Sequence, residues 1–418
     1  MKNKSLTPQI RFKGYDDEWQ QAKVKDVFTL GNGYTPSKAN PAFWTNGTIP
    51  WFRMEDIREN GRVLSDSIQH VTPEAIKSSG LFPAGSIIVS TTATIGEHAL
   101  LIADSLANQQ FTVFQTVNRW SWLKAKYLLY RFYGLGDWCR KNVNAGGLAA
   151  VSITDLQKYD IDFPSTEAER DSIANYFDNI DKLIVDTEQE ITRLEKMKQA
   201  SLQKMFPRPG ETTPEIRFSG YTEPWRFIRL KQVCESFKYG LNAAAKKFDG
   251  KHKYLRITDI DDVTHQFNQS DLTSPDTESL SEECKLHPND IVFARTGASV
   301  GKTYLYDEKD GDVFWAGFLI RAHVSSEFDS SFVFQMTTTR MYWDYIALSS
   351  QRSGQPGVNA EQYADFSFYV PVLAEQQKIG KYFRNLDALI SSKRQKLEKL
   401  QNLKQSCLDK MFINTSAQ

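Results

Sequence analysis

The chain has 418 residues, which is too long for one ordinary hydrophobic core, so two or more domains are expected. Lysine plus arginine equals aspartate plus glutamate at 51 each, so there is no overall basic field of the kind that many nucleic-acid binders carry. The sequence shows no apolar leader, no run of 18 apolar residues and no paired cysteines, which argues against secretion, membrane spans, disulfides and a zinc site and predicts a cytoplasmic protein.

The first segment of the chain is a motif that occurs twice. Pro8-Gln-Ile-Arg-Phe-Lys-Gly-Tyr15 returns 206 residues later as Pro214-Glu-Ile-Arg-Phe-Ser-Gly-Tyr221, and Leu202-Gln-Lys-Met-Phe206 returns as Leu408-Asp-Lys-Met-Phe412. Between these ends the two copies diverge but stay alignable. A duplicated unit with similar ends and different middles indicates one scaffold with two specificities, although a fusion of two like domains gives the same pattern.

Residues 1–165 are predicted to form the first compact α/β domain, with a strand at 86–90 and a helix near 122–133. Its turns are polar and contain glycine and aromatic residues. Reading a DNA sequence requires hydrogen-bonding side chains on such turns, together with basic side chains for phosphates. The candidates for DNA contact in this domain are Tyr34, Thr35, Ser37, Lys38, Arg53, Thr92, Thr94 and Gln109.

Residues 166–207 are predicted to be a long helix. The stretch 167–206 contains neither glycine nor proline, and Pro207-Arg-Pro-Gly210 ends the helix. Apolar residues recur at spacings of three and four or their multiples, which predicts a coiled-coil seam. In this helix the seam comprises Phe177, Ile180, Ile184, Ile191 and Leu194.

Residues 208–372 are predicted to repeat the α/β domain, with a strand at 290–294 and a helix near 331–346. Polar turns at several equivalent places provide further candidates for DNA contact. They are Tyr239, Asn242, Lys246, Lys247, Arg256, Arg295, Thr296, Ser299, Lys302 and Gln355. Taken singly, each of these turns in either copy is also consistent with an ordinary surface loop.

Two short patterns in this second domain suggest enzymes. Gly297-Ala-Ser-Val-Gly-Lys-Thr303 is similar to a phosphate-binding loop, but it is one residue short between the glycines and a strand is expected to follow it. Asp276, Glu283 and Lys285 have the spacing of a metal-dependent nuclease, a pattern that is common by chance and is missing from the first copy. The six histidines never occur at metal-ligand spacing. No catalytic residue and no metal ligand is therefore predicted.

Residues 373–412 are predicted to be the second long helix, followed by a tail at 413–418. The stretch 167–206 carries nine acids and six bases, whereas 374–412 carries four acids and nine bases, so the charges favour pairing of the two helices. Because the second helix must return toward the first domain, we expect an antiparallel coiled coil with a pseudo-two-fold internal repeat. The alternative is that each helix packs only on its own domain. The seam in this helix comprises Phe383, Leu386, Ile390, Leu397 and Leu400.

Over essentially the whole chain, these features resemble the specificity (S) subunits of bacterial type I restriction-modification systems. The resemblance rests on the duplicated order of variable domain and long helix, on the Pro-x-Ile-Arg-Phe-x-Gly-Tyr motif and on Arg295-Thr-Gly-Ala-Ser-Val-Gly-Lys302. It implies two tandem target-recognition domains of mixed α/β structure. Each would read one half of a bipartite site in double-stranded DNA, and the helices would set the spacing between the halves.

The same resemblance implies partner subunits. Two methyltransferase subunits are expected to dock on this chain, and endonuclease/translocase subunits are expected to join the complex. S-adenosylmethionine, ATP and Mg²⁺ are expected on those partners, whereas this chain is expected to bind no cofactor and to catalyse no reaction. Two other functions stay open, namely a stand-alone metal-dependent nuclease and a coiled-coil scaffold that binds only protein.

Overall fold

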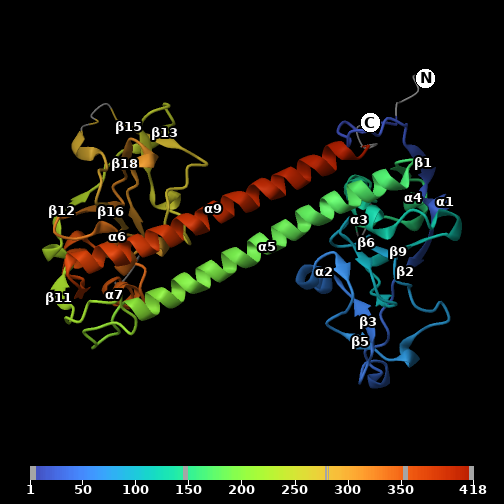
Figure 1. Cartoon of the computed structure of the whole chain (residues 1–418), viewed down its shortest axis with the longest axis horizontal. Coiled ribbons are helices and arrows are strands. Elements are labelled where there is room, and N and C mark those ends of the chain that lie inside the picture. The colour runs from blue at the N-terminus through green and yellow to red at the C-terminus, as the bar shows by residue number, and fades with distance from the viewer. Residues whose placement is uncertain (1–5, 145–148, 278–279, 281, 352–355, 414–418) are drawn as a thin grey trace. The chain divides into compact units, whose positions relative to one another are not determined.

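The computed structural model describes residues 6–144, 149–277, 280, 282–351 and 356–413. The chain divides into two compact units: residues 1–186 with 397–418 form unit 1, and residues 187–396 form unit 2. Two long helices, α5 (Glu167–Met205) and α9 (Leu373–Met411), each begin in one unit and end in the other (Figure 1). Helix α5 lies within the segment 166–207, and helix α9 lies within the segment 373–412, that the sequence predicts to be helical.

Unit 1 combines short strands with a few helices. Its strands are β1 (Gln20–Lys23), β2 (Phe28–Asn32), β3 (Ile49–Phe52), β4 (Val63–Leu64), β5 (His70–Val71), β6 (Ile87–Ser90), β7 (His98–Leu101), β8 (Leu106–Ala107), β9 (Phe111–Thr116) and β10 (Asp160–Phe163). Its other helices are α1 (Val24–Val27), α2 (Met54–Asn60), α3 (Ala125–Lys141) and α4 (Ile153–Leu156), with 3-10 turns η1 (Pro41–Phe43), η2 (Pro73–Ala75) and η3 (Asn118–Trp120). The sheets have the orders β2-β9-β6-β7-β4, β5-β3-β8 and β1-β10, and only the β3–β8 and β4–β7 pairs among them are parallel.

Unit 2 repeats much of this plan. Its strands are β11 (Arg226–Arg229), β12 (Cys234–Tyr239), β13 (Ala244–Lys247), β14 (Lys253–Leu255), β15 (Thr273–Asp276), β16 (Asp290–Ala294), β17 (Thr303–Leu305), β18 (Val313–Trp315), β19 (Leu319–Val324) and β20 (Ser367–Val370). Its other helices are α6 (Ser330–Met336), α7 (Arg340–Ser349) and α8 (Ala360–Asp365), with 3-10 turns η4 (Leu230–Gln232), η5 (Ile257–Asp259), η6 (Glu282–Cys284), η7 (Gly297–Ser299) and η8 (Glu308–Asp310). The order β12-β19-β16-β17 matches β2-β9-β6-β7, the parallel pair β14-β18 matches β3-β8, and β11-β20 matches β1-β10; β13-β15 is a further hairpin.

The central strand of each main sheet is buried on both faces. In β6, Ile87 and Val89 pack into the core that contains helix α3, whereas Ile88 packs into a second core with residues of α2. In β16, Ile291 and Val292 divide in the same way between two cores. Alternate side chains of a strand point to opposite faces, so a strand covered on both sides is apolar throughout. This explains why the runs at 86–90 and 290–294 were recognisable as strands in the sequence.

The predicted helix near 331–346 is interrupted. It consists of α6 and α7, which are separated by three consecutive threonines at 337–339. The Thr337 hydroxyl donates to the carbonyl of Phe334 (2.7 Å), and the Thr339 hydroxyl accepts from the amide of Tyr342 at the start of α7. Threonine side chains that bond to nearby backbone groups compete with the helical ladder, so an apolar pattern alone did not reveal this break.

The two long helices run antiparallel within each unit. In unit 1 the Tyr176 hydroxyl of α5 lies 3.3 Å from Cys407 Sγ of α9, and Lys404 pairs with Asp181 at 2.5 Å. In unit 2 the opposite ends meet, and Ser201 and Tyr382 are hydrogen-bonded at 2.9 Å. The predicted antiparallel coiled coil is therefore confirmed.

The seam between the helices is apolar with complementary charges beside it. Leu194, Leu386 and Ile390 form a buried cluster in unit 2. Three ion pairs between α5 and α9 flank this cluster. They are Glu190–Lys393 (2.7 Å), Glu195–Arg394 (2.6 Å) and Lys198–Asp387 (2.7 Å), each named with the α5 residue first. Ile180 and Ile191 are also buried, whereas Ile184, Leu397 and Leu400 are half-buried.

Two predicted seam residues have a further role. Phe177 of α5 belongs to the core of unit 1, where its ring stacks on Phe412 with centroids 5.8 Å apart. Phe383 of α9 belongs to the core of unit 2 beside Phe206. The start of each helix is thus part of a domain core as well as of the helix pair.

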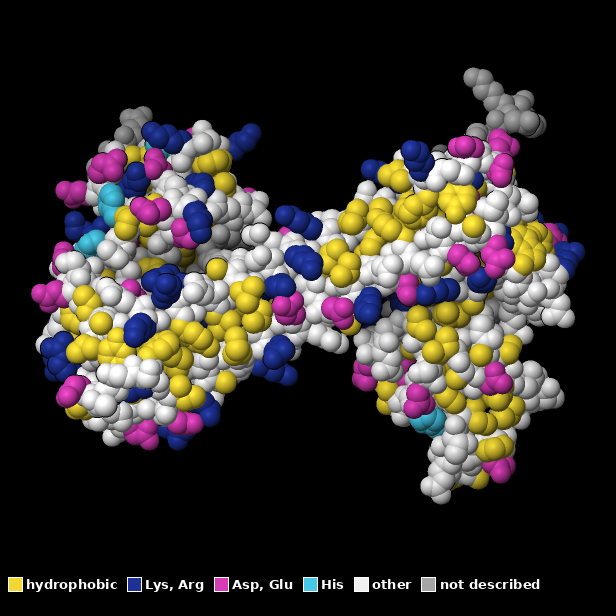
Figure 2. Space-filling view, viewed as in Figure 1, with side chains coloured by type: hydrophobic (Ala, Val, Ile, Leu, Met, Phe, Trp, Pro, Cys, Tyr) yellow, Lys and Arg dark blue, Asp and Glu magenta, His cyan; other side chains and the backbone are white. Residues whose placement is uncertain are grey.

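Charges are mixed on the surface. Figure 2 shows lysine and arginine side chains interspersed with aspartate and glutamate over the visible face of each unit. Because the charges are mixed, basic groups that could contact phosphates are expected at particular loops rather than over a whole face.

No helix among the described residues is long and apolar enough to cross a membrane.

Candidate nucleic-acid interface

In unit 1 a glycine-bearing loop is bonded to a tight turn. The amide of Gly33 donates to the carbonyl of Phe111 (2.9 Å), and the amide of Tyr34 donates to the carbonyl of Ala107 (2.8 Å). The turn itself is closed by a bond from the Phe111 amide to the Asn108 carbonyl (3.2 Å). A Cβ atom at Gly33 would lie 2.0 Å from the Asn108 oxygen, so only glycine permits this approach.

Unit 2 contains the same backbone arrangement. The amide of Gly240 donates to the carbonyl of Leu319 (3.1 Å), and the amide of Leu241 donates to the carbonyl of Trp315 (2.8 Å). The turn is closed from the Leu319 amide to the Ala316 carbonyl (2.9 Å). A Cβ atom at Gly240 would lie 2.2 Å from the Ala316 oxygen, so glycine is required here for the same steric reason.

A third segment completes each arrangement. The amide of Thr91, just after β6, donates to the carbonyl of Gln110 (2.9 Å), and the amide of Arg295, just after β16, donates to the carbonyl of Phe318 (3.1 Å). We call these three segments the recognition cluster of each unit. In unit 1 it comprises residues 33–38, 91–92 and 108–111, and in unit 2 residues 239–242, 295–296 and 316–319. The hydrogen bonds make Gln110 equivalent to Phe318 and Thr91 equivalent to Arg295.

The loop 33–38 in the recognition cluster of unit 1 lies beside the buried Trp51. The Nζ of Lys38 lies 6.0 Å and the guanidinium carbon of Arg53 lies 5.6 Å from the centre of the indole ring, within the range of cation–π attraction. The indole N–H donates to the carbonyl of Tyr34 (3.0 Å), and the Thr35 hydroxyl donates to Oε1 of Gln109. The structure thus brings together five predicted residues: Tyr34, Thr35, Lys38, Arg53 and Gln109.

The other candidates of unit 1 lie at its margin. Ser37 is exposed, and its carbonyl accepts from the indole N–H of Trp44 (3.1 Å). Thr92 pairs with Ala150 in an isolated bridge beside the cluster. Thr94 lies further along this loop, where its hydroxyl is 3.3 Å from that of Ser90.

The recognition cluster of unit 2 displays aromatic and basic groups. Tyr239 is half exposed, and the Arg295 guanidinium lies 4.9 Å above its ring. Thr296 pairs with Gly357 in an isolated bridge, and Asn242 is exposed. Phe318, which the sequence did not suggest, is 64% exposed at the turn.

The remaining candidates of unit 2 lie apart from this cluster or are already bonded. Lys246 and Lys247 are exposed on β13, with Lys246 Nζ 3.6 Å from Asp276. The Arg256 guanidinium makes two bonds to Asp259 (2.8 and 2.7 Å), and Ser299 is half-buried in η7. Gln355 lies outside the described residues.

The placement of Lys302 does not support the prediction that it contacts DNA. Its side chain is buried, and its Nζ donates to the carbonyl of Ile260 (2.8 Å) and pairs with Asp262 (2.5 Å). The preceding glycine segment leads into the strand β17, as the sequence predicts, rather than into a helix that could hold phosphate. The segment therefore lacks the helix start on which a phosphate-binding loop depends.

The proposed nuclease residues do not share a site. Each is paired with a different base or acid: Asp276 with Lys246 (3.6 Å), Glu283 with Lys238 (3.8 Å) and Lys285 with Asp312 (2.6 Å). Within the part of the chain that the structure describes, no group of three or more His, Cys, Asp or Glu side chains is placed to hold a metal ion. The spacing in the sequence does not produce a carboxylate cluster.

The repeated Pro-x-Ile-Arg-Phe-x-Gly-Tyr motif joins the two long helices in unit 1. Arg11 makes two bonds to Glu169 in the first turn of α5 (2.6 and 2.9 Å), and the bond raises the pKa of Arg11. The indole N–H of Trp19 also donates to Glu169 (3.3 Å). The amide of Ile10 donates to the carbonyl of Lys410 in the last turn of α9 (3.0 Å). The motif therefore holds the start of one helix beside the end of the other.

The second copy of the motif makes the same contacts in unit 2. Arg217 bonds twice to Glu375 in the first turn of α9 (2.8 Å each), and the Ile216 amide donates to the carbonyl of Lys204 at the end of α5 (2.8 Å). Glu375, like Glu169, is fully buried. In each unit, one copy of the motif thus joins the start of one long helix to the end of the other.

Comparison with protein families gives the identity of this architecture. A family model described as the type I restriction modification DNA specificity domain matches residues 16–196 and again residues 222–402. The chain belongs to this family. Each match contains one recognition cluster and much of one long helix, so the repeat seen in the sequence is a tandem pair of specificity domains.

Relatives of similar length support the assignment. The specificity subunit of the type I restriction enzyme EcoprrI from Escherichia coli is 28% identical over 94% of this chain and 92% of its own length. The specificity subunit of MjaIX from Methanocaldococcus jannaschii is 26% identical over 43% of this chain and 42% of its own length. The crystal structure of the type I restriction-modification S subunit from M. genitalium has the same fold, with a TM-score of 0.64, 15% identity and coverage of 98% of this chain and 100% of its own.

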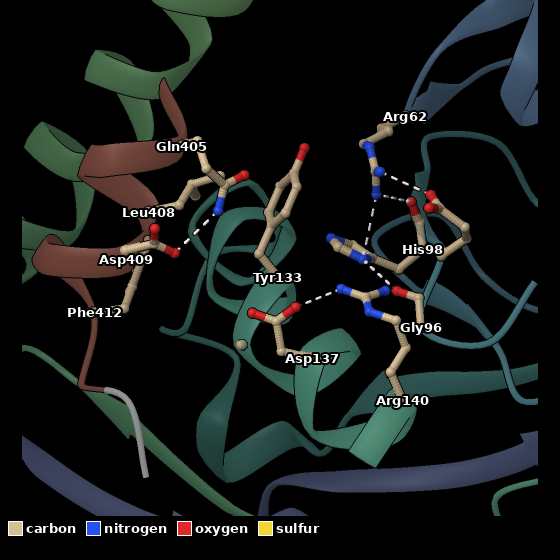
Figure 3. A pocket seen from close by; sticks show the side chains of 12 residues that line it. Arg62, Gly96, His98, Tyr133, Asp137, Arg140, Gln405, Leu408, Asp409 and Phe412 are labelled. Carbon is tan, nitrogen blue, oxygen red and sulfur yellow. Dashed lines mark hydrogen bonds and ion pairs between the residues drawn. The ribbon is translucent and has the colours of Figure 1, made fainter. Parts of the chain in front are cut away.

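The specificity domain of unit 1 also contains a small cavity beside a buried histidine. The cavity has a volume of about 140 Å³ and lies between the β6–β7 loop, α3 and the end of α9. Figure 3 shows the His98 ring between Arg62 and Arg140, with Tyr133 between His98 and Gln405 of α9. The Nε2 of His98 donates to the carbonyl of Leu129 (2.9 Å). Burial, and secondly the charge of Arg62, lower the pKa of His98 to about 3.

We expect the stability of unit 1 to decrease in mild acid because of His98. The folded pKa lies below the ordinary value of 6.5, so between pH 6.5 and 3 the unfolded chain binds a proton that the folded chain does not. The loss amounts to about 2 kcal/mol at pH 5, from ~1.4 kcal/mol per pH unit. Denaturation of His98→Gln should show a smaller drop between pH 7 and pH 5 than the native chain. The control His70→Gln, at a half-buried histidine outside this cavity, should retain the full drop. Equal drops in native and His98→Gln chains would contradict the expectation.

Proposed function

We propose that this chain is the DNA sequence-specificity subunit of a type I restriction-modification complex and that each recognition cluster reads one half of a bipartite duplex site. The observation that carries the proposal is the pair of recognition clusters. The same backbone hydrogen bonds hold the same three segments in both units, while the side chains on them differ. A constant frame with variable side chains is what two different half-sites on one scaffold require.

The chemistry of the clusters suits duplex DNA. In unit 1 the amides of Gln109 and Gln110 can bond to the edge of adenine in the major groove, while Lys38 can contact phosphate. In unit 2 the Arg295 guanidinium can donate hydrogen bonds to a guanine edge or a phosphate, and Lys246 and Lys247 add local positive charge. These local groups account for DNA binding by a chain whose net charge is zero.

The partners belong to the same proposal. Helices α5 and α9 set the spacing between the half-sites and provide docking surface for two methyltransferase subunits, and endonuclease/translocase subunits join them. S-adenosylmethionine, ATP and Mg²⁺ bind to those partners, so this chain acts as a non-catalytic subunit. Support comes from the names of the relatives and from a chain of the same fold (TM-score 0.55, 16% identity, 94% of this chain and 97% of its own) in a study of the complex assembly of the type I restriction-modification system.

Exchange of one domain tests the proposal. We expect that replacing residues 1–165 by the matching domain of a related subunit changes one half-site of the methylated sequence and leaves the other half and the spacer length unchanged. The measurement is methylome sequencing of cells that express the chain with its methyltransferase partners. Exchange of residues 208–372 is the matched control and should alter only the other half. A change in both halves from either single exchange would contradict the proposal, and so would the lack of any methylated motif.

A further inference from the structure

An exposed phenyl ring marks the recognition cluster of unit 2. Phe318 is 64% exposed, whereas its neighbours Leu319 and Ala316 are buried. Its backbone is held in place, because its carbonyl accepts from the Arg295 amide (3.1 Å) and the turn is closed by the bond from Leu319 to Ala316 (2.9 Å). A large apolar side chain left in water at a rigid turn costs free energy that contact with an apolar group would recover.

The equivalent position in unit 1 carries a polar side chain. Gln110 occupies the place of Phe318, and it follows the exposed Gln109. Amide side chains on a turn are suited to the donors and acceptors of base edges in the major groove. Because the backbone frame is the same, the side chain at this place in unit 2 should reach the same depth of the groove. There the apolar feature that a base edge presents is the 5-methyl group of thymine.

We propose that Phe318 is a specificity-determining residue that packs against the 5-methyl group of one thymine in the half-site read by unit 2. This inference rests on the proposed function, since it assumes that the recognition cluster faces the major groove. The neighbouring groups are consistent with the contact. The Arg295 guanidinium lies 4.9 Å above the Tyr239 ring and 3.5 Å from the carbonyl of Gly317, the residue before Phe318, so it supplies a positive charge close to this turn for a phosphate or a guanine edge.

Deoxyuridine provides a direct test, because it differs from thymine only by the missing methyl group. The complex of the full chain with its methyltransferase partners is titrated with duplexes that carry the recognised sequence, each with one thymine of the unit 2 half-site replaced by deoxyuridine. We expect one replacement to weaken binding about fourfold, the effect of burying one methyl-sized group, and the others to have little effect. The same replacement should make no difference to the variant Phe318→Ala.

Two controls separate the contact from other effects of the substitution. Phe227 is 61% exposed on β11 of the same unit, outside the recognition cluster, so Phe227→Ala should retain the sensitivity to deoxyuridine. Equal thermal unfolding of native chain and Phe318→Ala should show that the fold is intact. If Phe318→Ala weakens binding to every duplex and deoxyuridine has no effect, the ring stacks between bases and the methyl contact is wrong.

The outcomes also distinguish this inference from the function on which it rests. A native complex that binds its site specifically but binds every deoxyuridine duplex as tightly as the parent contradicts the role of Phe318 and leaves the proposed function intact. A unit 2 half-site that contains no thymine on either strand has the same consequence. A native complex without any sequence preference contradicts the proposed function itself.

Discussion

Replacement of Arg11 by methionine should destabilise unit 1 by about 3–5 kcal/mol, because it leaves the carboxylate of Glu169 buried without its cationic partner. Glu169 is fully buried, and Arg11 provides two of its hydrogen bonds, at 2.6 and 2.9 Å. The contact closes the junction between the first turn of α5 and the Pro-x-Ile-Arg-Phe-x-Gly-Tyr motif. Hydrogen exchange followed by mass spectrometry measures the effect, since it reports the first turn of α5 separately from unit 2.

A second substitution tests the cause of this effect. If the unpaired charge is responsible, Arg11→Met combined with Glu169→Gln should recover at least half of the lost stability. Arg340 is almost fully exposed and lies 3.5 Å from Asp344, so Arg340→Met should cost less than about 1 kcal/mol. A loss for Arg11→Met no larger than that of Arg340→Met would show that the motif does not hold the helices together.

Replacement of Gly33 by alanine should separate the glycine loop of unit 1 from its turn. The new Cβ would lie 2.0 Å from the carbonyl oxygen of Asn108, and a backbone atom cannot move aside as a flexible side chain can. Overpacking of this kind costs about 1–3 kcal/mol, which corresponds to a loss of DNA affinity of about 5-fold to 150-fold if the recognition cluster must be restored on binding. Titration of the complex with its recognised duplex measures this loss.

The matched control is Gly31→Ala, two residues earlier, in strand β2. A Cβ at Gly31 meets only Cε1 of Phe82, at 3.3 Å, so a small adjustment of one side chain accommodates it. We expect this variant to bind DNA within about twofold of the native complex, as expected for a surface-strand change of a few tenths of a kcal/mol. Similar affinities for Gly31→Ala and Gly33→Ala would mean that the recognition cluster does not contribute to binding.

The repeated motif can be identified from the sequence, but its structural role cannot. The copies at 8–15 and 214–221 were recognisable from the letters alone. Their role depends on Glu169 and Glu375, which are 158 residues away from Arg11 and Arg217 respectively. No local pattern links positions so far apart, so the carboxylate partners emerged only when the chain was folded.

The candidate site was predicted in part, for a similar reason. Polar, glycine-bearing turns led to Thr35 and Gln109, which the structure joins by a hydrogen bond across 74 residues. The same criterion selected Lys302. Its side chain is buried and bonded to the carbonyl of Ile260, which the loop-like sequence around it does not reveal. Phe318 was missed because an exposed phenylalanine looks like a core residue in a sequence. Aligning the turn 108–111 with 316–319, at an offset of 208 instead of 206, would have revealed it.

The duplicated plan, the two long helices and their complementary charges followed from the sequence without a structure. These properties depend on repeated sequence motifs and on local periodicity, and both can be recognised without knowing which distant residues are in contact. The tertiary structure decided which polar turns form a recognition cluster, which basic side chains are already paired and which aromatic ring faces outward. Those properties depend on burial and on hydrogen bonds between residues far apart in the chain, and strand pairing, rather than local sequence, brings such residues together.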